Sequence, residues 1–108
     1  MKFEEYQNES KKYALYPERH AMNCYLFGLV EEVGEISEIY KVVHRDNDGK
    51  LGEDSKKSLE KELGDVLWYL TQISNHFDIP LEDVANTNLK KLESRMQRGV
   101  IDGRGDDR

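Results

Sequence analysis

Four carboxylates stand in two short motifs with the same internal spacing. Glu32 and Glu35 are three residues apart, and Glu62 and Asp65 repeat that spacing further along the chain. Residues three apart on a helix lie on one face, one above the other. A single pair of this kind is typical of a solvated helix surface. Two matched pairs favour a cation site, provided that both helices turn their acids to the same side.

Apolar residues place both motifs on long helices. They follow a strict heptad a/d spacing in two segments: Met22, Leu26, Leu29, Val33, Ile36, Tyr40 and Val43, then Leu59, Leu63, Val66, Leu70, Ile73 and Phe77. Such seams pack helices side by side, and the short connection predicts an antiparallel hairpin. Glu32 and Glu62 then fall at g positions and Glu35 and Asp65 at c positions. A symmetric hairpin brings all four acids to one flank at one height, although the register can slip by one turn.

The chemistry of that flank points to a hard divalent cation. Carboxylates a few ångströms apart raise one another's pKa unless a positive charge joins them. Oxygen ligands on rigid helices suit Mg²⁺, with Mn²⁺ as a second choice. The chain lacks the Glu-x-x-His pairs of a di-iron bundle, and Cys24 alone cannot build a zinc cluster. The 46–49 segment, DNDG, is interpreted as a turn rather than a calcium loop.

Few helix breakers interrupt the chain. Pro17, Pro80 and the 46–52 segment divide it into helices predicted at about 3–14, 20–45, 54–77 and 81–98. No segment shows the alternation of a strand. The fold class is therefore all-α, a four-helix bundle-like domain over 1–98 with a central antiparallel hairpin. The last helix is expected to close the bundle with its apolar stripe, and the irregular tail, 99–108, to belong to the same domain.

Two further groups of residues are candidates for binding. Tyr25 and Tyr69 flank the acids and could give the groove aromatic walls for a nucleobase; packing under another helix is the alternative. Asn88, Lys91 and Arg95 share one flank of the last helix, where an amide and two cations could hold phosphate oxygens. An ordinary solvated flank is the alternative for that group.

A second apolar strip lies away from the acids and consists of Phe27, Val30, Leu67 and Trp68. A monomer would leave this strip exposed to water. We therefore expect a subunit interface there, in a homodimer or a homotetramer.

Composition excludes several classes of protein. The 108 residues carry 22 acidic and 16 basic side chains, which give a net charge of -6. A chain this acidic, without a basic block, is unlike a nucleic-acid-binding protein. Its apolar runs are far too short for a membrane span, and it shows no signal peptide. We expect a cytoplasmic protein with a small-molecule partner.

The two acidic motifs, EEVGE at 31–35 and ELGD at 62–65, resemble the signature of the MazG-like all-α nucleoside triphosphate pyrophosphohydrolases. The Tyr16-Pro17 pair, the NLKKLESR segment and the ending RGVIDGRGDDR are similar to the single-domain branch of that family. The resemblance covers nearly the whole chain. The two acidic motifs are specific as a pair and weak singly.

The resemblance implies Mg²⁺-dependent cleavage of an NTP or dNTP to the monophosphate and pyrophosphate, as a nucleotide-pool sanitation enzyme. It implies the same four carboxylates as metal ligands and phosphate contacts by Asn88, Lys91 and Arg95. Glu31, beside the ligands, is our candidate for the general base or for an outer metal ligand. Phosphoribosyl-ATP pyrophosphohydrolase activity is the nearest alternative. A non-catalytic metal-binding helical module is the alternative of another class.

Overall fold

The computed structural model describes residues 1–108, and the chain is all-α. Four α-helices follow one another as α1 (Phe3–Ser10), α2 (Glu18–Asn47), α3 (Glu53–His76) and α4 (Leu81–Gln97), with a short 3₁₀ helix, η1 (Lys11–Tyr13), after α1. The predicted fold class is confirmed. The four predicted helical segments agree with the observed bounds to within a few residues, apart from the 3₁₀ turn that ends the first.

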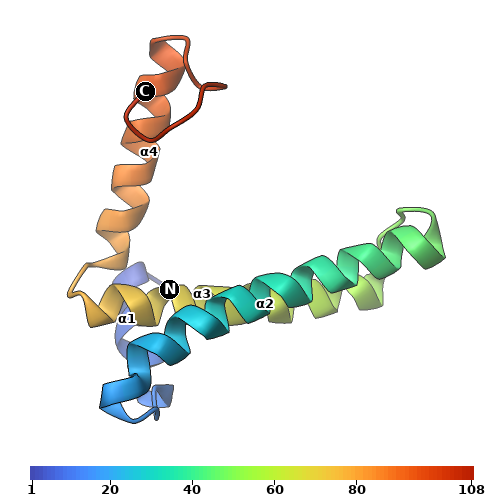
Figure 1. Ribbon diagram of the computed structural model, residues 1–108, viewed down its shortest axis with the longest axis horizontal. Coiled ribbons are helices and arrows are strands. Elements are labelled where there is room, and N and C mark those ends of the chain that lie inside the picture. Colours follow the sequence, from blue (N-terminus) through green and yellow to red (C-terminus); the bar gives the residue numbers. More distant parts are fainter.

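The centre of the molecule is the antiparallel hairpin of α2 and α3 (Figure 1). Pro17 precedes the first turn of α2, where its lack of an N–H is harmless. Asp48 ends α2 in the left-handed conformation, and Gly49, with a φ of 75°, donates its N–H to the Val43 carbonyl. This left-handed cap satisfies a free carbonyl at the end of the helix and reverses the chain.

The contact between α2 and α3 is rotated away from the predicted a/d seam. The d positions are half-buried or buried, whereas the a positions are 38–57% exposed. Residues at g positions, such as Glu32 and Glu62, are half-buried between the two helices instead. The exposed a row consists of Leu26, Val33 and Tyr40 on α2 and Leu63, Leu70 and Phe77 on α3. One long apolar face of the hairpin is therefore uncovered within the chain.

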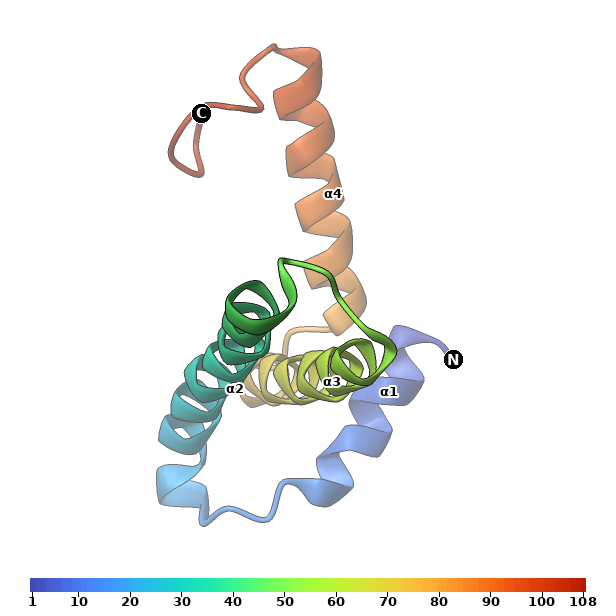
Figure 2. The same ribbon diagram turned by 90° about the vertical axis from the view of Figure 1, so that its right-hand side faces the viewer.

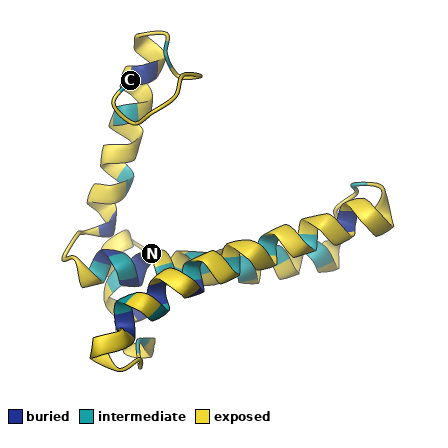
Figure 3. Cartoon of the chain, in the orientation of Figure 1, coloured by how far each residue is buried: buried dark blue, intermediate teal, exposed yellow.

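A polar network joins α1 to the C-terminal half of α3. Ser10 lies at its centre: its carbonyl accepts a hydrogen bond from Trp68 Nε1 at 3.1 Å, and its Oγ accepts one from Gln72 Nε2 at 2.8 Å. Thr71 and Gln72 are almost completely buried. Figure 3 shows that buried residues gather where α1 and α3 meet the start of α2. Trp68, predicted in the exposed strip with Phe27, is half-buried and bonded to α1, so the strip does not include it.

Helix α4 projects away from the hairpin instead of lying along it (Figures 1 and 2). Its main contacts are with α1. Gln7 fixes this direction, because its Oε1 accepts from the Leu81 N–H at 2.8 Å and its Nε2 donates to the Ile79 carbonyl at 2.9 Å. Three residues of the apolar stripe of α4, Leu89, Leu92 and Met96, remain exposed. The expected closure of the bundle by this helix is therefore not made within the chain. None of the helices has the length and apolar composition needed to cross a membrane.

Candidate functional site

Three carboxylates from the two central helices converge halfway along the hairpin. Glu32 of α2 and Glu62 and Asp65 of α3 each offer one oxygen, and these oxygens lie within 4.8 Å of one another. Glu62 and Asp65 are one helical turn apart, so their side chains stand side by side. Glu32 and Glu62 are half-buried and Asp65 is exposed, which leaves the cluster open on one side.

Glu35, the fourth predicted ligand, lies beside the cluster rather than in its centre. It shares with Glu62 a surface hollow of 370 Å³, whose other lining residues come from both helices: Glu38, Ile39, Val42, Asp54, Ser55 and Ser58. The structure therefore places Glu35 beside Glu62 but outside the group of three converging carboxylates. Glu31 is exposed, one residue before Glu32, and contributes to the negative field on it.

The cluster is electrostatically strained in the absence of a cation. Burial raises the pKa of Glu32 from 4.5 to about 7, helped by a hydrogen bond with the Glu62 carboxyl and by the charges of Asp65, Glu62 and Glu31. No lysine or arginine forms an ion pair with any of the cluster acids. Hard oxygen donors with unbalanced negative charge are the ligand set that a divalent cation of the magnesium type requires. The residues present therefore fit a metal.

Tyr69 lies close enough to the cluster to sense the charge of Glu32. Its pKa is raised by a hydrogen bond with the Tyr16 hydroxyl, then by burial and by the nearby charges of Glu32 and Glu31. The two hydroxyl oxygens are 3.1 Å apart. Its ring packs on Gly28, where a Cβ atom would come within 2.2 Å of the ring. Gly28 is thus the position on α2 that leaves room for the Tyr69 ring.

Tyr25 occupies a different environment from Tyr69. It is 8% exposed and makes edge contacts with the rings of Tyr16, at 5.9 Å between centroids, and of Trp68, at 6.1 Å. The Tyr25 ring is therefore packed against other aromatic side chains at this end of the hairpin, as in the packing alternative for this residue. The sequence marks Tyr16 only as part of the Tyr16-Pro17 pair of the family resemblance. Neither the helical period nor the acidic spacing indicates that Tyr16 and Gly28 position Tyr69.

The structure separates the cations of α4 from the carboxylates. Lys91 and Arg95 lie together, and both form an ion pair with Asp106 of the tail, at 3.0 and 3.2 Å. Asn88 and Lys91 line a hollow on the side of α4. Helix α4 projects from the hairpin (Figure 2), and Lys91 and Arg95 form no ion pair with an acid of the cluster in the same chain.

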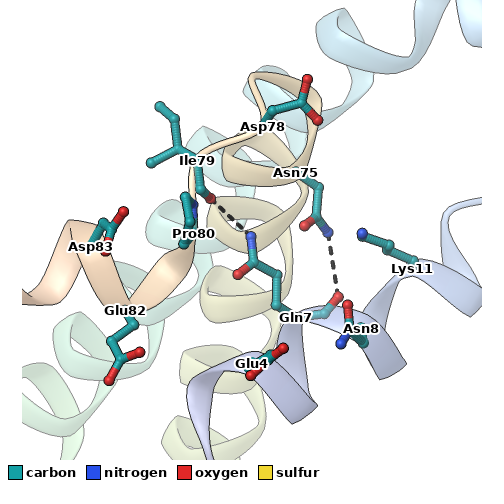
Figure 4. A pocket seen from close by; sticks show the side chains of 10 residues that line it. All are labelled: Glu4, Gln7, Asn8, Lys11, Asn75, Asp78, Ile79, Pro80, Glu82 and Asp83. Atoms are coloured by element: carbon teal, nitrogen blue, oxygen red, sulfur yellow. Dashed lines mark hydrogen bonds between the residues drawn. The ribbon is translucent and has the colours of Figure 1, made fainter.

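A further cavity, of 450 Å³, lies between α1 and the α3–α4 connection (Figure 4). Its walls carry Lys11 and four carboxylates, and Gln7 crosses it to bond Ile79. Asn75 also reaches the Gln7 carbonyl, at 3.5 Å. The polar groups at this place hold the base of α4, and the cavity contains none of the cluster acids.

Comparison with known proteins identifies the family. Residues 21–100 match the model of the MazG nucleotide pyrophosphohydrolase domain. The chain belongs to the MazG family. All four predicted metal ligands lie inside the matched region of this MazG chain, whereas most of the tail that carries Asp106 lies outside it.

Two relatives of this MazG chain extend the comparison. The Gene 37 protein of Mycobacterium phage L5 is 40% identical over 109 residues, which cover 95% of this chain and 96% of the phage protein. YpjD of Bacillus subtilis (strain 168) is 36% identical over 67 residues, 62% of this chain and 60% of its own length. No solved structure matches the chain.

Proposed function

We propose that this MazG domain is a divalent-metal-dependent pyrophosphohydrolase that converts a nucleoside or deoxynucleoside triphosphate to its monophosphate and pyrophosphate. The observation that carries the proposal is the cluster of Glu32, Glu62 and Asp65, in which one carboxylate has a pKa of about 7 and none has a basic partner. The family match supports the reaction class. A role in clearing unwanted nucleotides from the cytoplasmic pool agrees with this chemistry.

Each acid has a distinct task in this proposal. Glu32, Glu62 and Asp65 would hold the cation, and Glu35 would reach it from the neighbouring hollow. A bound Mg²⁺ would offset charge on the phosphate oxygens and make a bound water easier to ionise. Glu31 would accept the proton of the attacking water, whose oxygen is added as the anhydride between the α and β phosphates breaks. Tyr69 would form the wall beside the metal.

The proposed enzyme works as a homodimer or a homotetramer. Apolar surfaces on two parts of the chain lack a partner. On the hairpin they are the exposed a row and the strip of Phe27, Val30 and Leu67, and on α4 the surface is its apolar stripe. The hairpin site has acids without cations, and α4 has cations without access to that site. A second copy that lays its α4 near the hairpin would cover apolar surface on both parts and bring Asn88, Lys91 and Arg95 toward the phosphates.

A nucleotide panel tests the activity. Canonical and modified NTPs and dNTPs, together with phosphoribosyl-ATP, are incubated with and without Mg²⁺ or Mn²⁺, and monophosphate and pyrophosphate are quantified. We expect release of both products that EDTA abolishes. Glu62→Gln should remove activity, whereas Glu60→Gln, an exposed acid on the same helix, should keep it. Metal binding without release from any nucleotide would favour a non-catalytic module.

Mixing inactive variants tests the shared site. Glu62→Gln removes a ligand and Lys91→Ala removes a cation, and each alone should be inactive. If a site combines the hairpin of one subunit with α4 of another, half of the randomly mixed dimers hold one intact site, and activity returns to about one quarter of the wild-type level. Failure to recover activity, with subunit exchange shown by mass spectrometry, would place both residues in the same subunit's site.

A further inference from the structure

The C-terminal tail, 99–108, folds back on the last turns of α4 as a closed loop (Figure 1). Gly99, with a φ of 72°, ends the helix, and the Val100 N–H bonds the Arg95 carbonyl at 2.9 Å. Arg108 then ties the loop to itself, because its guanidinium donates to the carbonyls of Val100, Ile101 and Gly105 at 2.6–2.8 Å. The tail is therefore a compact unit hinged at a glycine.

This loop delivers one carboxylate to the two cations of α4. Asp106 Oδ1 lies 3.0 Å from Lys91 Nζ and 3.2 Å from Arg95 Nη2. The cations, in turn, lower the pKa of Asp106, Lys91 first and Arg95 second. The neighbouring Asp107 makes no such ion pair. An acidic side chain of the chain itself thus occupies the place between two cations one helical turn apart.

The fit of Asp106 on Arg95 is incomplete. The Arg95 side chain is 6% exposed, and its Nη2 has three acceptors: Asp106 Oδ1 and the carbonyls of Asp106 and Gly105. Its Nε is buried and has no partner. A guanidinium binds best when two parallel N–H groups meet two oxygens of one anion. The present arrangement leaves one of these two donors unused.

Asp106 itself holds the two cations only weakly. The Asp106 side chain is 81% exposed, and exposed ion pairs gain little because water screens them. The terminal oxygens of a polyphosphate could meet Nε, Nη2 and Lys91 Nζ together and carry more charge than one carboxylate. A phosphate group would therefore displace the aspartate from these cations.

We propose that Asp106 occupies the phosphate position on Lys91 and Arg95, so that the C-terminal tail is an internal competitor of the polyphosphate chain of the substrate. The tail opens at Gly99 when a phosphate binds and closes when it leaves. The identity of the ligand as a nucleotide polyphosphate rests on the proposed function. The competition itself rests on the contacts of Asp106.

Inorganic tripolyphosphate, titrated calorimetrically without divalent metal at fixed ionic strength, tests the competition. Asp106→Asn should tighten binding by about fivefold, the most that an exposed ion pair contributes. Asp107→Asn makes the same change in net charge and should alter affinity by about twofold or less. The double variant Asp106→Asn/Lys91→Ala should lose the gain, because one of the two cations is removed.

The contrary results are equally specific. Equal gains in both aspartate variants would reduce the effect to net charge and overturn the competition. Weaker binding by Asp106→Asn would show that this carboxylate orients the cations instead. Absence of binding by all variants would remove the anion site. If Asp106→Asn binds tripolyphosphate more tightly but the wild-type protein hydrolyses no nucleotide, the proposed function alone is overturned. If the wild type hydrolyses nucleotides and Asp106→Asn leaves the tripolyphosphate affinity unchanged, the competition alone is overturned.

Discussion

Binding of a metal to the acid cluster should release a proton, and the amount is set by Glu32. Its carboxyl has a pKa of about 7 in the metal-free protein because burial and the neighbouring acids disfavour its charge. A cation binds the ionised form, so any proton on Glu32 must leave. With a pKa of about 7, about 0.9 proton is bound at pH 6 and about 0.1 at pH 8.

The apparent affinity follows from the same occupancy. Protonation of Glu32 competes with the metal and therefore raises its apparent dissociation constant. The increase is about elevenfold at pH 6 and negligible at pH 8. Mg²⁺ or Mn²⁺ should therefore bind about tenfold more tightly at pH 8 than at pH 6. Calorimetry in buffers of different ionisation enthalpy measures the proton count directly, alongside the affinity.

Two variants separate Glu32 from the other acids. Glu32→Gln cannot release this proton, so its weaker binding should lose most of the pH dependence. Glu60→Gln, an exposed acid on α3, should keep the wild-type proton count. Release near zero at pH 6 by the wild type, or undiminished release by Glu32→Gln, would refute the reasoning that burial and the neighbouring acids hold a proton on this carboxyl.

The same shift makes a prediction for stability. A carboxyl whose pKa is higher in the folded than in the unfolded state binds extra protons on folding, so its contribution to stability is present at low pH. The metal-free protein should therefore lose free energy of unfolding as the pH rises from about 4.5 through about 7, the range between the ordinary and the raised pKa of Glu32. Urea titrations at several pH values measure this trend. Saturating Mg²⁺ should remove it, and a flat profile in metal-free protein would contradict the shift.

Three substitutions test packing and assembly. Gly28→Ala should lower the free energy of unfolding by about 1–3 kcal/mol in urea titrations, since its Cβ would overlap a tyrosine ring. The control, Gly34→Ala, lies on the same helix with open space around it and should not destabilise the isolated chain. Equal losses in the two variants would contradict the packing argument. Gln72→Ala should lower the free energy of unfolding by about 1–3 kcal/mol because it leaves buried hydrogen-bonding partners unsatisfied. Gln97→Ala, at an exposed position, should lower it far less. Similar losses in the two variants would show that the buried network adds little to stability. Phe27→Glu places a charge on an exposed apolar face and should shift sedimentation toward monomer, whereas an unchanged mass would remove this face from the subunit interface.

Helix boundaries and the hairpin could be predicted because they depend on local signals. Pro17 and the 46–52 turn end or begin helices wherever they occur, and the heptad spacing of two adjacent segments favours side-by-side packing. The direction of α4 could not be predicted in this way. It is set by Gln7, which contacts Leu81 and Ile79 more than seventy residues away, and no periodicity encodes a contact of that range.

The rotation of the hairpin explains which parts of the acid cluster the sequence revealed. An a/d pattern states which rows are apolar but not which row another subunit covers. In the structure the d and g rows face inward, so Glu32 and Glu62 at g positions are half-buried while Glu35 and Asp65 at c positions are exposed. The heptad pattern predicts a set of acids on one flank, and the rotation determines that Glu32 is sheltered, which contributes to its raised pKa.

Charge is unbalanced at both ends of the proposed site when the chain is considered alone. The hairpin gathers acids with no cation, and α4 gathers Lys91 and Arg95, whose two charges are only half offset by the one carboxylate of Asp106. The net charge of -6 hides this separation, because it averages over a surface on which the acids and the cations do not meet. A metal on the hairpin would invert the local sign there, and a polyphosphate needs positive charge at both ends of its length. A triphosphate bridging the metal to α4 would release Asp106, satisfy Arg95 Nε and offset the acids together, so we expect nucleotide, metal and subunit assembly to stabilise one another.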